Sequence, residues 1–229
     1  MKERPVIFNS EMVRAILNGR KTQTRRVINP QPTLSERTGF NWKGAAYGIG
    51  STYRDTVRNF ANCFKTCPFG QVGDRLWVRE TFAVLGNEDG CPIDWNGNLI
   101  KGDEKQAARI YKASCWQEPG NYGLWSIPDR ETQYEGTWRP SIHMPRWASR
   151  IMLEITAVRV ERLNDISEED AKAEGVKAGV CPGHEHMMHQ VAFSELWQSI
   201  YGEESWRANP WVWVIEFKQV SAREVEREA

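Results

Sequence analysis

The chain has 229 residues, and its 30 basic and 30 acidic side chains give a formal net charge of zero at pH 7. This balance excludes a protein that coats nucleic acid through bulk positive charge, although local charged patches stay possible. Five cysteines, an N-terminal segment without an apolar signal core and short apolar runs predict a cytoplasmic protein with reduced thiols and no membrane partner.

The first predicted element is a helix that leads into a basic segment. Ser10 is predicted to cap this helix, because apolar residues repeat at helical spacing over the following positions up to 17. Gly19 is the residue type expected where such a helix ends. Lys21 therefore falls in a connecting loop.

The segment after this loop predicts a strand over residues 22–28. Alternation in a strand places Thr24 and Arg26 on one face. No acidic residue occurs between positions 11 and 36, so the basic side chains of this region predict a positive local field. An anionic or electron-rich ligand is the natural partner of such a field.

The middle of the chain contains two segments, about 30–70 and 83–138, that are rich in Gly, Asn, Pro and charged residues. We interpret both as insertions with only short strands, such as 108–113, and with a hairpin turn at Asn96-Gly97. Between them, residues 73–80 predict a turn and a strand. The core face of this strand carries Leu76 and Val78, and the other face carries Trp77 and Arg79.

Two predicted elements follow in the C-terminal third. A strand begins near residue 151, and its apolar phase changes in a way that suggests a bulge or bend near Ala157. A helix follows, with Ser167 as its cap in a capping-box variant completed by Asp170 and with Gly175 at its end. Glu174 therefore lies in the last turn of this helix.

The last predicted elements are a helix and a central strand. Phe193, Trp197 and Ile200 recur at helical spacing, and 211–217 is apolar on both faces, which predicts a strand inside a sheet. We predict a single α+β domain over residues 1–219 with insertions at about 30–70 and 83–138, followed by a polar tail at 220–229.

This order of elements, with its motif Gly-x-Lys-x-x-Thr-x-Arg at 19–26, resembles the ASCH domain family. The resemblance implies a PUA-like β-barrel with flanking helices and two long loop insertions. Most members have glutamate where this chain has Thr24, and the threonine is similar to the small bacterial acetylcytidine amidohydrolases of that family. Over its full length the chain is similar to longer ASCH-containing proteins of phages and prophages.

The resemblance also implies a catalytic set. Carried over by position, the lysine, threonine and glutamate of the amidohydrolases fall on Lys21, Thr24 and Glu174. A neutral lysine can take the proton of a threonine hydroxyl that attacks an amide. Burial and the neighbouring cations Arg20, Arg25 and Arg26 would lower the pKa of Lys21. Glu174 would then protonate the leaving amine or activate water. The implied partner is a nucleoside or an RNA with a modified cytidine, and no cofactor is implied.

Four further residues are candidates for binding the substrate. Arg26 is predicted to stabilise an oxyanion and Trp77 to stack on a pyrimidine, while Arg79 and Glu80 either line the same cleft or form a cross-strand ion pair. The rival functions are an RNA-binding or modified-base-binding module without turnover, a phage accessory protein that contacts other proteins, and a ribonuclease. The ribonuclease reading is the weakest, because the four histidines offer no obvious acid/base pair.

A metal site is the last alternative. Cysteine and histidine ligands are closely spaced in Cys63-x-x-x-Cys67 and in Cys181-x-x-His184-x-His186-x-x-His189. The spacing does not match a standard zinc finger, and both clusters lie in loops. We therefore predict no metal and interpret these side chains as loop histidines and inert thiols.

Overall fold

The computed structural model describes residues 1–62, 67–128, 130, 132–178 and 188–221. The chain forms two compact units: the first contains residues 1–4, 15–76 and 153–229, and the second contains 5–14 and 77–152. Four elements pass from one unit into the other: β1 (Glu3–Ile7), α1 (Ser10–Leu17), β6 (Arg75–Arg79) and β12 (Met152–Arg162).

The largest sheet has the strand order β1-β6-β12-β13-β2, in which β2 is Gln23–Val27 and β13 is Trp211–Val220. β13 lies between β12 and β2, and Trp211 to Ile215 are all buried, so the predicted central strand is confirmed. β1 and β2 are the two edges of this sheet, and no strand pairing in the described residues closes it into a barrel. The α+β class is confirmed.

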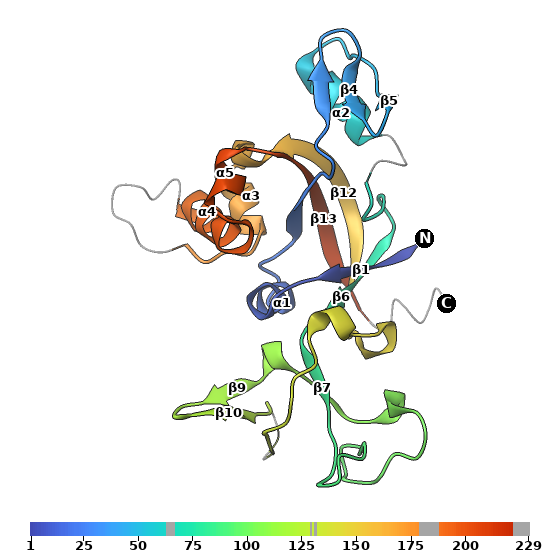
Figure 1. Cartoon of the computed structure of the whole chain (residues 1–229), viewed down its shortest axis with the longest axis vertical. Helices are drawn as coiled ribbons and strands as arrows, with labels where there is room; N and C mark the ends of the chain where they lie inside the picture. Colours follow the sequence, from blue (N-terminus) through green and yellow to red (C-terminus); the bar gives the residue numbers. More distant parts are fainter. Residues whose placement is uncertain (63–66, 129, 131, 179–187, 222–229) are drawn as a thin grey trace. The chain divides into compact units, whose positions relative to one another are not determined.

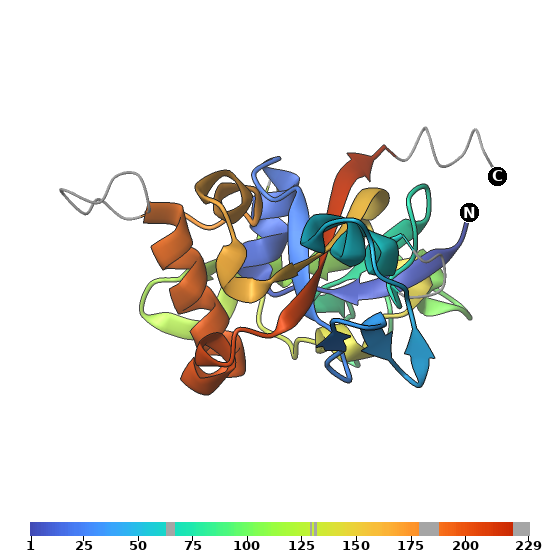
Figure 2. The same ribbon diagram turned by 90° about the horizontal axis from the view of Figure 1, so that it is seen from above.

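Helices of the first unit pack beside β2 and β13, as Figures 1 and 2 both show. They are α3 (Glu168–Ala173), α4 (Met188–Tyr201) and α5 (Glu203–Arg207). Phe193 and Trp197 of α4 are buried and pack against Val212 and Val214 of β13 in one apolar cluster. Ile200 was predicted to share this face, but it is 45% exposed and lies outside the cluster.

The predicted helix caps are partly correct. Ser167 caps α3 by accepting a hydrogen bond from the Asp170 amide at 3.1 Å, as the sequence indicated. The Asp170 carboxylate does not complete a capping box, because it binds arginines instead. The cap of α1 is also different: Asn9, one residue before Ser10, accepts a hydrogen bond from the Met12 amide at 2.8 Å.

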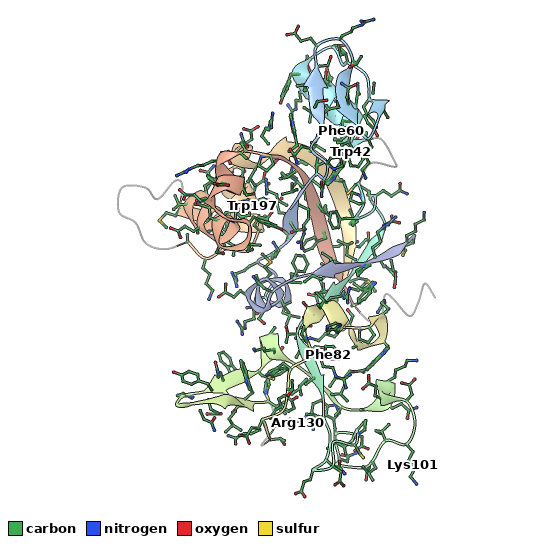
Figure 3. The ribbon with its side chains drawn as sticks, in the orientation of Figure 1. Trp42, Phe60, Phe82, Lys101, Arg130 and Trp197 are labelled. Atoms are coloured by element: carbon green, nitrogen blue, oxygen red, sulfur yellow. The ribbon has the colours of Figure 1, made fainter. Side chains whose placement is uncertain are left out.

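The predicted insertion at 30–70 contains more structure than expected. It forms a small sheet in the order β3-β4-β5 and a helix that the sequence analysis missed. Phe60 of this helix stacks on Phe40 of β4 and on Trp213 of β13, with centroid distances of 4.8 and 5.5 Å. Figure 3 shows Phe60 close to Trp42, and their rings are 5.9 Å apart. This segment comprises β3 (Thr33–Ser35), β4 (Gly39–Trp42), β5 (Ala45–Ala46) and α2 (Tyr53–Ala61).

The second unit is built from short strands. Its elements are β7 (Phe82–Val84), β8 (Arg109–Tyr111), β9 (Trp116–Glu118), β10 (Asn121–Ser126) and β11 (Gln133–Tyr134). Buried Ala83, Ile110, Cys115 and Ile127 form its main apolar cluster, and Phe82 belongs to a smaller one. The predicted turn at Asn96-Gly97 is confirmed, because Ile93 and Leu99 form an antiparallel bridge and Gly97 has a φ of 82°.

Two strand predictions are also confirmed. In β6, Leu76 and Val78 are buried while Trp77 is partly exposed. β12 is a single strand whose buried positions change phase from Leu153 and Ile155 to Val160, and Figure 1 shows it as strongly curved. β13 extends to Val220, into the predicted tail, and the remainder of that tail from 222 onward lies outside the described residues. No helix in the described ranges is both long enough and apolar enough to cross a bilayer.

Candidate functional site

Lys21 lies in the loop between α1 and β2, as predicted. Gly19 has a φ of 69°, which allows the chain to leave the helix, and the Lys21 amide then donates to the Ala15 carbonyl at 3.0 Å. The next amide, that of Thr22, donates to the carbonyl of Ala173 at 2.9 Å. These backbone hydrogen bonds hold Lys21 against the C-terminal end of α3.

The Lys21 amine and the Glu174 carboxylate form a buried ion pair across 153 positions of sequence. Nζ of Lys21 lies 2.7 Å from Oε2 of Glu174 and donates to the Glu174 carbonyl oxygen at 2.9 Å. The two side chains are 0% and 4% exposed, so water hardly competes for either charge. The structure thus brings together two members of the predicted catalytic set, which the sequence alone had no means of doing.

The end of α3 determines where Glu174 lies. Glu174 is the C-cap residue, and its amide donates to carbonyls of the last turn. Gly175 follows with a φ of 85°, and a Cβ atom at this position would lie 2.7 Å from the Cβ of Lys21. Only glycine combines this backbone conformation with such a close approach. Gly175 therefore permits the contact between Lys21 and Glu174.

Burial lowers the pKa of Lys21 below 10.5, because the charged ammonium loses its hydration. The Glu174 carboxylate opposes this effect, and the charges of Arg26 and Arg25 add to it. The predicted direction and the predicted roles of burial, Arg25 and Arg26 are confirmed. Arg20, the third arginine in the prediction, instead donates to the carbonyl of Gly175 at 2.7 Å.

Arg25 joins three carboxylates that come from two other elements. One terminal nitrogen lies 3.3 Å from Glu174, and the other lies 3.0 Å from both Glu161 on β12 and Asp170 on α3. The Arg25 side chain is 0% exposed. Gln23, which shares the Arg25 face of β2, donates to the Asp170 carbonyl at 2.6 Å. At Gln23 and Arg25, this face of β2 is therefore covered by polar groups of α3 and β12.

Arg159 of β12 extends this ionic network. It contacts Asp170 at 2.7 Å and also binds the carboxylates of Glu161 and Glu216. Partial burial alone would raise the pKa of Asp170, but the hydrogen bond and charge of Arg159, together with Arg25, outweigh it and hold that pKa below 3.8. Asp170 is therefore ionised at neutral pH and ties α3 to two strands.

Thr24 and Arg26 lie on the opposite face of β2 from Arg25, as strand alternation requires. Thr24 pairs with Ile215 of β13, and Arg26 pairs with Trp213. Thr24 is 3% exposed, and its hydroxyl makes no hydrogen bond to Lys21 or Glu174 in the described part of the chain. The predicted set is therefore divided: Lys21 and Glu174 meet, and Thr24 belongs to the other side of the strand.

The three remaining candidates lie in the second unit. Arg79 packs over the ring of Trp77 at 5.7 Å and donates to the Ser141 carbonyl at 3.1 Å. Glu80 is 2% exposed at its side chain and forms a two-pronged ion pair with Arg150, at 2.9 and 3.1 Å. Glu80 therefore forms an ion pair, but not the predicted cross-strand one, because Glu80 follows β6 and Arg150 precedes β12. Burial raises the pKa of Glu80, and Arg150 opposes that rise.

The metal alternative concerns residues that are mostly outside the described ranges. Cys63, Cys181, His184 and His186 are among them. Within the described ranges, no three or more ligating side chains cluster. His189 lies at the start of α4 with Nδ1 2.7 Å from Glu168, and burial raises the pKa of Cys67 to about 11, which disfavours the thiolate that binds metals.

Neither the family models, nor the curated proteins, nor the solved structures contain a match to this chain. No similar protein therefore indicates what the site does, and its chemistry is inferred from the arrangement of its residues. Arg25 was predicted only as a neighbouring charge. Its partners Glu161 and Asp170, and Arg159, which binds the same two carboxylates, were not predicted. One signal was available: Asp170 and Glu174 are four positions apart, so they share a helix face with the spacing that suits a common cation.

Proposed function

We propose that this chain is an ASCH-like protein of PUA-like fold that hydrolyses an amide on a modified cytidine. The observation that supports this function is the buried contact between Lys21 and Glu174. The resemblance assigns these two residues to one catalytic set, and they are in contact although 153 positions separate them. A lysine whose pKa is lowered by burial is also the kind of base that amide hydrolysis requires.

The proposed reaction begins at the threonine. The neutral Lys21 amine takes the hydroxyl proton of Thr24, and Oγ1 attacks the carbonyl carbon of the N-acyl group. Arg26, on the same face of β2 as Thr24, stabilises the negative oxygen that forms. The C–N bond then breaks, and the Lys21 ammonium returns its proton to the departing amine of cytidine.

A second half-reaction restores the enzyme. Glu174 takes a proton from water, the resulting hydroxide attacks the acyl-threonine ester, and the Thr24 oxygen leaves with the proton from Glu174. The products are the carboxylic acid and cytidine. This sequence requires the Lys21 amine to leave Glu174 and reach the Thr24 hydroxyl when substrate binds. Catalytic hydrogen bonds often form only in the substrate complex.

The second candidate is a module that binds RNA or a modified base without turnover. Two observations favour it: the Lys21 amine already donates to two oxygens of Glu174, and Thr24 lies on the face of β2 opposite Arg25. This function needs no proton transfer between Lys21 and Thr24. It predicts loss of binding in Arg26→Ala and no effect of removing the Thr24 hydroxyl.

The deciding experiment incubates the protein with N-acylated cytidines, free and within short RNA, and follows cytidine release by chromatography. Thr24→Val removes the hydroxyl and keeps the shape of the side chain, whereas Thr24→Ser keeps a hydroxyl. We expect Thr24→Val to abolish release while ligand affinity stays within about tenfold, roughly 1.4 kcal/mol, and Thr24→Ser to retain activity.

Thr22→Val is the matched control, because Thr22 is exposed and lies just before β2. It should leave cytidine release unchanged. Wild-type release no greater than that of Thr24→Val would contradict the hydrolase and leave the binding module as the function to pursue. RNA binding would then be recognised by an affinity that falls steeply with salt.

A further inference from the structure

Each oxygen of the Glu174 carboxylate has a different cationic partner. Lys21 binds Oε2 at 2.7 Å, and Arg25 binds Oε1 at 3.3 Å. Both cations have fully buried side chains. A carboxylate held at both oxygens cannot rotate away from the Lys21 amine without losing the second ion pair.

We propose that Arg25 is a positioning residue that fixes the Glu174 carboxylate against the Lys21 amine. The effect of this positioning on catalysis rests on the hydrolase function proposed above. The positioning of Glu174 by Arg25 does not depend on that function. Arg25 touches neither Lys21 nor Thr24 through a hydrogen bond in the described residues, so it acts through Glu174.

The geometry requires an arginine at this position. The two terminal nitrogens of Arg25 divide their contacts: one binds Glu174, and the other binds Glu161 and Asp170 together. The planar guanidinium offers five donors in a fixed arrangement, whereas a lysine offers one compact charged group. Arg25→Lys therefore keeps the charge but cannot reach three carboxylates from two elements at once.

Arg25 also contributes to the field around Lys21. The charged groups that face Lys21 include Glu174 from the end of α3 and two arginines of β2, Arg25 and Arg26. Asp170 and Glu161 lie behind Arg25, at 3.0 Å from it. Arg25 lowers the pKa of Lys21, but the Glu174 carboxylate that it holds raises this pKa more strongly, so losing the contact with Glu174 outweighs losing the Arg25 charge and the pKa should fall.

Arg159 provides a matched control within the same network. Like Arg25, it binds both Glu161 and Asp170, but in the part of the chain that the structure describes no ion pair or hydrogen bond joins it to Glu174. Arg159→Met and Arg25→Met therefore both break ion pairs of β12 and α3. Only Arg25→Met releases the carboxylate that faces Lys21.

The experiment measures the Lys21 pKa directly, from the pH dependence of the ¹³Cε chemical shift of labelled lysine, with Lys21→Met to assign the signal. In Arg25→Met we expect this pKa to fall, because the Glu174 carboxylate is released, and in Arg159→Met we expect a much smaller change. A rise in Arg25→Met would show that Glu174 stays in place, and it would overturn the proposal. Equal pKa changes in the two variants, or no change in either, would overturn the proposal. If Arg25→Met does not fold, Arg25→Lys replaces it, because that variant keeps the charge. Arg25→Lys should shift the Lys21 signal because it disturbs Glu174. An unchanged signal in that variant would equally overturn the proposal.

The same variants are assayed for release of cytidine from N-acylated cytidine as a function of pH. If the wild type is active, Arg25→Met should move the pH of half-maximal kcat downward with the Lys21 pKa, and Arg25→Lys should lower kcat more than it raises KM. If the wild type releases nothing, the hydrolase function fails while the ¹³C titration still decides the role of Arg25. The two failures are therefore distinguishable.

Discussion

The contact between Lys21 and Glu174 depends on the residue that follows Glu174. A Cβ atom at Gly175 would lie 2.7 Å from the Cβ of Lys21 and 2.9 Å from that of Ala15, at a φ of 85°. We expect Gly175→Ala to lower the free energy of unfolding through two effects: about 1–2 kcal/mol from the left-handed backbone and a further ~1–3 kcal/mol from overpacking against Lys21. Urea denaturation measures the sum.

Gly19→Ala separates these two effects. Gly19 follows the end of α1 with a φ of 69°, as Gly175 follows the end of α3, but a Cβ atom there would meet no heavy atom within 4 Å. This variant should show the backbone cost without the overpacking. Equal losses of stability in Gly175→Ala and Gly19→Ala would mean that the chain relaxes around the added methyl group, and that the approach of Lys21 to α3 is not sterically tight.

At the scale of elements, α3 is fastened to β2 and β12 by the Asp170 carboxylate. Its pKa is held below 3.8 in the folded protein, because Arg159 and Arg25 outweigh the effect of burial. Its contribution to stability is therefore fully present above about pH 4 and is lost as the pH falls through the folded-state pKa. We expect Asp170→Asn to destabilise the protein at pH 6 and to make the remaining acid-induced loss of stability shallower.

Urea denaturation at a series of pH values from 6 down to 2.5 tests this expectation. Glu169→Gln is the control, because Glu169 is exposed on the same helix. This substitution removes one negative charge, as Asp170→Asn does. That variant should follow the wild-type curve. An Asp170→Asn curve parallel to the wild type throughout would show that Asp170 titrates with the same pKa in the folded and unfolded chain.

At the scale of the whole molecule, each unit has a buried core of its own. Phe60 is fully buried among aromatic rings of the first unit, and Phe82 is fully buried in a cluster of the second. Removal of a buried phenylalanine side chain costs about 3–5 kcal/mol. We expect Phe60→Ala to lower hydrogen-exchange protection chiefly in peptides of the first unit, and Phe82→Ala chiefly in peptides of the second.

Mass spectrometry of peptides after hydrogen exchange measures the protection of both units in each variant. The wild type provides the reference protection for each peptide. If either substitution lowers protection equally in both units, the chain unfolds as one cooperative body, in agreement with the single domain that the sequence analysis predicts.

The amino-acid sequence by itself determined the local elements. Periodicity was sufficient for the central strand β13 and for the buried face of α4 at Phe193 and Trp197, and the special conformation of glycine was sufficient for the ends of α1 and α3. These features depend on neighbours within a few positions. The helix α2 was missed, because its apolar residues Val57 and Phe60 are few and its burial comes from aromatic partners on β4 and β13.

Only the tertiary structure decided which side chains meet. Lys21 and Glu174 form a pair because the loop before β2 lies against the end of α3, and this approach follows from packing between segments more than 150 positions apart. The same packing gave Arg25 three carboxylate partners, while strand alternation turned Thr24 to the other face. Local pattern specifies which face a residue occupies, but the partner on that face is specified by the whole fold, because long-range contacts have no periodicity in the sequence.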